Sequence, residues 1–110
     1  MSDHVHVIDQ DRFEAEVLRS HEPVLLDFFS TECPPCEALA PKYEAVAGQF
    51  AGRARFFKIF RQGNRELAAK LGVTGSPTVL LFKDGREVGG RLSGDIKRSE
   101  LRQAVEALVA

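Results

Sequence analysis

Two cysteines, Cys33 and Cys36, are the residues of this 110-residue chain whose type and spacing point most directly to chemistry. They are its only cysteines, and Pro34 and Pro35 separate them. Residues three apart share one face of a helix, so the two sulfur atoms can meet and close a disulfide ring. The pattern predicts a pair of thiols that forms and reopens a disulfide.

The segments on either side predict how the cysteines are held. Residues 24–29 are almost entirely apolar, which is typical of a central strand covered on both faces. Residues 37–51 place apolar side chains at helical spacing, and prolines just before them are tolerated in a first turn. Cys33 then stands at the start of a helix, where free N–H groups and partial positive charge stabilise a thiolate. The thiolate is the form that attacks a disulfide.

Asp27 is the one charged residue inside the apolar run 24–29. A carboxylate in a buried strand needs a partner or a raised pKa. If burial raises its pKa towards neutrality, Asp27 could accept a proton from Cys36 during disulfide exchange.

The rest of the chain alternates between strand and helix patterns. A short edge strand is expected over 4–8, followed by a helix over 11–20 with Phe13, Val17 and Leu18 towards the core. Lys83-Asp84-Gly85-Arg86 predicts a type I′ hairpin. The remaining expected elements are strands over 54–60, 78–82 and 87–92 and helices over 65–71 and 96–109.

This order, β-α-β-α-β-α-β-β-α, predicts an α/β fold with a central mixed sheet of about five strands flanked by four helices. The length of residues 1–110 predicts a single domain.

Composition excludes several classes of protein. A net charge of -1 argues against a nucleic-acid or acidic-membrane partner, and no apolar stretch is long enough to span a bilayer. The N-terminus lacks the pattern of a signal peptide, so we expect a cytoplasmic location. The three histidines lie far from the cysteines in sequence, and no nucleotide or flavin motif is present, so we expect no metal and no cofactor. We expect a monomer that receives electrons from another protein or a small thiol.

The order of elements, with the cysteine pair after the second strand, resembles the thioredoxin family over residues 5–110. Other marks stand at the family's spacing: Asp27 six residues before Cys33, Ala40-Pro41, Lys58, Gly75-Ser76-Pro77-Thr78 and Phe82-Lys83-Asp84-Gly85.

The resemblance implies roles for individual residues. Cys33 corresponds to an exposed attacking thiol and Cys36 to a buried resolving thiol. Asp27 corresponds to the carboxylate beneath the pair, with Lys58 as its companion; alternatively, these two form only a structural ion pair. Pro77 corresponds to a cis-proline facing the disulfide. The substrate groove implied by the resemblance comprises Glu32, Pro34, Pro35, Ser76, Pro77 and Gly94.

The sequence also departs from the family pattern. Glu32 stands where a tryptophan is usual, and its carboxylate should raise the pKa of Cys33. Pro34 replaces a glycine, and Ser76 replaces an isoleucine before the proline. The segment 60–62, Phe-Arg-Gln, replaces one that often carries aspartates. These changes predict a thioredoxin-like protein with its own set of substrates.

The sequence is compatible with three functions. The first is a reductase of protein disulfides that acts through a mixed disulfide on Cys33, in cell redox homeostasis. The second is a disulfide oxidant or isomerase on the same scaffold, because residues between the cysteines tune redox potential. The third is a binding module in which the cysteines are incidental.

Overall fold

The computed structural model describes residues 3–110 and contains one mixed β-sheet. The strands lie in the order β1-β3-β2-β4-β5, and β6 also pairs with β4. β1, β3 and β2 are parallel to one another, whereas β4 runs antiparallel to β2, β5 and β6. The strand bounds are β1 Val5–Val7, β2 Val24–Phe29, β3 Arg55–Phe60, β4 Thr78–Lys83, β5 Arg86–Glu87 and β6 Leu92–Ser93.

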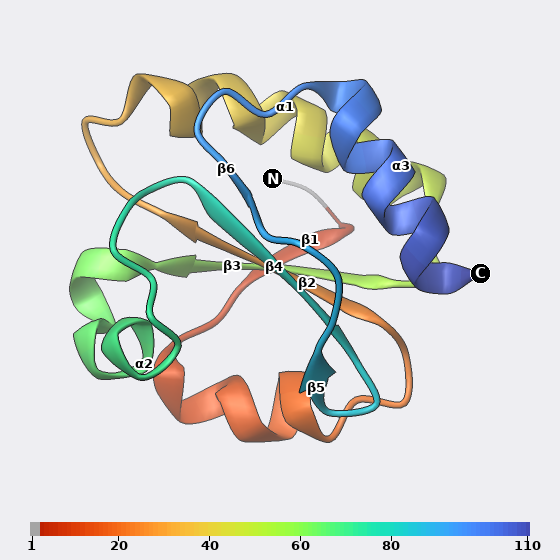
Figure 1. The fold of residues 1–110 in the computed structure, drawn as a ribbon, viewed down its shortest axis with the longest axis horizontal. Helices are drawn as coiled ribbons and strands as arrows, with labels where there is room; N and C mark the ends of the chain where they lie inside the picture. Colours follow the sequence, from red (N-terminus) through yellow and green to blue (C-terminus); the bar gives the residue numbers. More distant parts are fainter. Residues whose placement is uncertain (1–2) are drawn as a thin grey trace.

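Helices cover both faces of the sheet, as Figure 1 shows. Helices α1 (Pro34–Gln49) and α3 (Arg98–Val109) pack on one face. The short helices η1 (Gln10–Arg12) and η2 (Glu14–Leu18) and helix α2 (Arg65–Lys70) pack on the other. The predicted α/β arrangement and order of elements are therefore confirmed.

Two details differ from the expectations. The first helical region is a 3-10 turn followed by a π-helix, and Leu18, the last residue of that helix, is 37% exposed rather than in the core. The expected return strand over 87–92 is broken into β5 and β6, with Gly89 between them at a φ of 67°.

The side chains of β2 alternate between the two cores. Leu25 belongs to the cluster beneath α1 and α3, whereas Leu26 and Phe28 belong to the cluster beneath η2 and α2. Successive side chains of a strand point to opposite faces, so Asp27 shares the α1 face with Leu25. The strand therefore places one carboxyl group beneath the helix that begins beside the cysteines.

Candidate functional site

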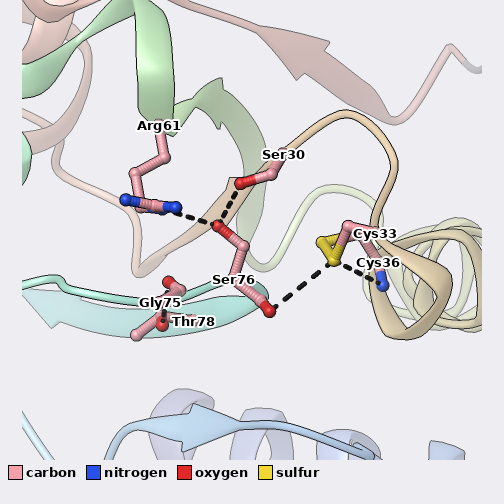
Figure 2. Close-up of a disulfide and its surroundings, with 7 residues drawn as sticks. All are labelled: Ser30, Cys33, Cys36, Arg61, Gly75, Ser76 and Thr78. Atoms are coloured by element: carbon pink, nitrogen blue, oxygen red, sulfur yellow. Dashed lines mark hydrogen bonds between the residues drawn. A yellow bond between two sulfur atoms is a disulfide. The ribbon is translucent and has the colours of Figure 1, made fainter.

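The two cysteines form a disulfide at the N-terminus of α1, with their Cα atoms 5.2 Å apart (Figure 2). Cys33 is the N-cap residue, and its Sγ accepts a hydrogen bond from the backbone N–H of Cys36 at 3.3 Å. The helix begins at Pro34, three residues before the predicted start, because prolines in a first turn give no helical periodicity. An N–H group of the helix therefore points at the sulfur that would carry negative charge as a thiolate.

Burial does not distinguish the two cysteines, contrary to the implied exposed and buried thiols. Cys33 is 9% exposed and Cys36 is 7% exposed. The loop before β4 covers the Cys33 sulfur, since Sγ lies 3.6 Å from the carbonyl oxygen of Ser76. What distinguishes Cys33 is its position at the helix terminus and beside this loop.

The Ser76-Pro77 peptide bond is cis, as the resemblance implied. The hydroxyl of Thr78 donates a hydrogen bond to the carbonyl of Gly75 at 2.8 Å and closes the loop around the proline. The loop thus presents its backbone to the disulfide from the end of β4.

A surface hollow of about 310 Å³ adjoins this loop. Three of the expected groove residues, Ser76, Pro77 and Gly94, line it. The other three, Glu32, Pro34 and Pro35, are exposed but do not contribute to its walls. The hollow therefore lies on the β4 side of the disulfide.

Asp27 is 2% exposed, and its Oδ1 has no hydrogen-bond partner. Burial raises the pKa of Asp27 from 3.8 to about 7, although the positive charge of Lys58 lowers it in part. A carboxyl group with this pKa can hold or release a proton near neutral pH.

Lys58 lies opposite Asp27 in the register of β2 and β3. Its ammonium group lies over the ring of Phe29, 4.7 Å from the ring centroid, and is partly exposed. The ion pairs of residues 3–110 do not include Asp27 with Lys58. The geometry is therefore that of a cation near a buried carboxyl group rather than of a closed salt bridge.

A polar network around Ser76 was missed by the sequence interpretation. The Nε of Arg61 donates a hydrogen bond to the hydroxyl of Ser76 at 2.8 Å, and the hydroxyl of Ser30 donates to the same oxygen at 2.5 Å. The only sequence signals were the serine in place of isoleucine and the unusual segment 60–62. Neither indicated that these side chains meet.

Residues 3–110 were expected to hold no metal ion and to include no membrane span. They contain no group of three or more His, Cys, Asp or Glu side chains that could hold a metal ion. Nor does this part of the chain contain a helix that is long and apolar enough to cross a membrane.

A two-cysteine disulfide at a helix N-terminus, set against a cis-proline on a mixed sheet, defines the class of thiol–disulfide oxidoreductases. Residues 4–107 match the family model described as Thioredoxin. The chain belongs to the thioredoxin family, and its Cys33–Cys36 pair is that of a reductase of protein disulfides.

Individual relatives agree with this assignment. A thioredoxin of Pseudomonas aeruginosa is 34% identical over 97% of this chain and 98% of its own length. The chloroplastic thioredoxin X of Arabidopsis thaliana is 36% identical over 93% of this chain, which spans 57% of that longer protein. The crystal structure of a thioredoxin from Malassezia sympodialis has a TM-score of 0.85 and 29% identity, covering 96% of this chain and 91% of that one.

Proposed function

We propose that the chain reduces protein disulfides through a mixed disulfide on Cys33, which Cys36 then resolves. The observation that carries the proposal is the position of Cys33. It caps α1, is joined to Cys36, and lies beside the Ser76-Pro77 loop. The structure holds the oxidised form, which is the product of one turnover.

In the first step, the Cys33 thiolate attacks one sulfur of a substrate disulfide. A bond forms between Cys33 Sγ and that sulfur, the substrate S–S bond breaks, and the second substrate sulfur leaves and takes up a proton. The N-terminal position in α1 favours the thiolate needed for this step. Pro77 and Gly94, in the walls of the adjoining hollow, would contact the substrate chain, while Glu32, Pro34 and Pro35 would border it on the α1 side.

In the second step, Cys36 attacks Cys33, and its thiol proton passes to the carboxylate of Asp27, directly or through water. The Cys33–Cys36 bond forms as the mixed disulfide breaks, and the first substrate sulfur leaves as a thiolate that takes up a proton from Asp27 or from water. The net reaction transfers two electrons and two protons from the dithiol to the substrate. A pKa of about 7 suits Asp27 to this role, because a large share of the carboxyl groups is ionised at neutral pH. Lys58 would stabilise that ionised form.

Each turnover requires a new pair of electrons. Another dithiol, supplied by a reductase protein or a small thiol, must reopen the Cys33–Cys36 bond. We place this cycle in the cytoplasm as part of electron transport and redox homeostasis, since reduced thiols are maintained there. We also propose that residues 1–110 act as a monomeric domain, with no nucleic-acid or membrane partner.

Reduction of insulin by dithiothreitol tests the proposal. We expect the wild-type protein to accelerate precipitation of the insulin B chain, and Cys33→Ser to abolish that acceleration. A Cys36→Ser variant should instead accumulate a mixed disulfide with its substrate, visible as a dithiothreitol-sensitive increase in mass. Equal rates for the wild type and Cys33→Ser would refute the function.

A further inference from the structure

A single residue, Ser76, contacts both the sulfur of Cys33 and the side chain of Arg61. The Ser76 carbonyl oxygen lies 3.6 Å from Cys33 Sγ, and its hydroxyl accepts a hydrogen bond from Arg61 Nε at 2.8 Å. Figure 2 shows Ser76 between the guanidinium group and the disulfide. The guanidinium group is therefore bound to the loop that lies against Cys33, on the side of Ser76 away from the disulfide.

The guanidinium group is held in place but is not neutralised. The hydroxyl oxygen of Ser76 accepts two hydrogen bonds, one from the hydroxyl of Ser30 and one from Arg61 Nε. Within residues 3–110, Arg61 makes no ion pair with a carboxylate, and only its Nε forms a hydrogen bond. The Nη1 and Nη2 groups keep their donors for a ligand, and the side chain is partly exposed.

The neighbouring charges favour an anion at this position. The other cation beside the loop, Arg91, is already paired with Glu87 and bound to the carbonyl of Leu71. No carboxylate lines the hollow that adjoins Ser76. Glu32, the acidic residue before Cys33, is exposed and lies outside that lining. Arg61, which is bound to Ser76 but does not itself line the hollow, is therefore the unpaired cation in contact with this loop.

We propose that Arg61 selects disulfide substrates that carry a carboxylate within one or two residues of the sulfur attacked by Cys33. The inference rests on the proposed function and adds a preferred substrate class to it. A guanidinium group binds a carboxylate through two parallel hydrogen bonds, and a group already fixed by Ser76 loses less freedom on binding. Ser76 and Ser30 are positioning residues for this contact.

The test uses two peptides with the same leaving group. Each has one cysteine activated as a 2-pyridyl disulfide, flanked by Glu in one peptide and by Gln in the other. Fully reduced protein is mixed with each peptide, and the released thiopyridone is followed by absorbance. We expect the wild type to react faster with the Glu peptide. Arg61→Gln should reduce the ratio of the two rate constants about fivefold, as a partly exposed charge-assisted hydrogen bond implies.

Three variants separate selection from other effects. Arg61→Lys should retain part of the preference, because it keeps the charge without the paired donors. Ser76→Ala should lower the ratio less than Arg61→Gln, since the guanidinium group remains but loses its anchor. Arg86→Gln is the matched control: it removes the same charge from β5, which pairs with the opposite end of β4, and should leave the ratio unchanged.

The outcomes distinguish the inference from the proposed function. If Arg61→Gln slows both peptides equally, Arg61 only supports the Ser76 loop and the inference is wrong. An equal fall in the ratio for Arg86→Gln would also overturn it, since net charge alone would then explain the preference. A wild type that reacts with neither peptide faster than Cys33→Ser would instead refute the reductase function.

Discussion

Burial of the Asp27 carboxyl group in the sheet lowers the stability of the folded protein. Its neighbours in β2 are apolar, its Oδ1 has no hydrogen-bond partner, and the nearby Lys58 only partly offsets the cost of burial. An ionised carboxylate in such a place destabilises the fold, whereas the protonated form does so much less. The site therefore retains a titratable carboxyl group that the core alone would not favour.

This cost predicts a pH-dependent stability that the Asp27→Asn variant lacks. Well below pH 3.8 the carboxyl group is protonated in both states and has no effect. Between pH 4 and pH 7 the unfolded chain releases the proton while the folded protein keeps it, so the free energy of unfolding falls as pH rises. A rise in pKa from 3.8 to about 7 corresponds to about 4 kcal/mol once the folded-state carboxyl is also ionised.

Urea unfolding of the oxidised proteins measures the effect. Between pH 5 and pH 9 the free energy of unfolding should fall by about 3 kcal/mol more for the wild type than for Asp27→Asn. The difference is smaller than the full effect because part of the fall already occurs below pH 5. Every other titrating group is shared, so the difference isolates Asp27. Parallel pH profiles for the two proteins would show that Asp27 does not carry the shifted pKa.

Among the elements, those with a strong local signal in the sequence were predicted well. β2 occupies the expected range 24–29, and the expected hairpin has positive φ angles at both Asp84 and Gly85. The buried position of Asp27 followed from its place in an apolar run. In these cases the signal is local, because neighbouring residues along the chain determine the structure.

Features that depend on contacts between distant segments could not be predicted. Arg61 and Ser76 lie on separate loops, and no spacing rule says that their side chains meet. The near-equal exposure of the two cysteines depends on the carbonyl of Ser76, which is 43 residues away from Cys33. The cis peptide bond before Pro77 was expected only from the resemblance to thioredoxins.

The β4–β5 hairpin also contacts a distant element, which makes Gly85 a test of the packing. A Cβ atom at Gly85 would lie 2.8 Å from the backbone oxygen of Leu18, at the end of η2. Gly52 has a similar positive φ, 82° against 77°, but a Cβ atom there would meet nothing within 4 Å. Gly52→Ala should therefore cost about 1 kcal/mol of stability from backbone strain alone. Gly85→Ala should cost about 1–2 kcal/mol more, because backbone must also move.

Urea unfolding of both alanine variants and the wild type measures this difference. Equal destabilisation by the two substitutions would mean that the hairpin can move away from η2 without cost. Both variants replace a glycine of positive φ by alanine. Any additional loss of stability at Gly85 therefore reports the contact between the β4–β5 hairpin and η2.

At the scale of the whole molecule, the disulfide links folding to redox chemistry. Oxidised and reduced protein, each folded or unfolded, form a closed thermodynamic cycle. If oxidation stabilises the fold, folding must stabilise the disulfide by the same free energy, and the folded dithiol becomes a better reductant than the unfolded one. A fold that stabilised the reduced form would instead make the protein an oxidant. Stability measurements can therefore separate the reductase from an oxidant on the same scaffold.

The ring closed by Cys33 and Cys36 spans four residues, and its closure removes about 2 kcal/mol of chain entropy from the unfolded state. We therefore expect oxidised protein to unfold with a free energy about 2 kcal/mol higher than reduced protein at pH 7, measured in urea with and without dithiothreitol. By the cycle, this places the reduction potential of the folded disulfide about 40 mV below that of the unfolded chain. A Cys33→Ser/Cys36→Ser variant should not respond to dithiothreitol. Greater stability of the reduced wild type would contradict the reductase direction.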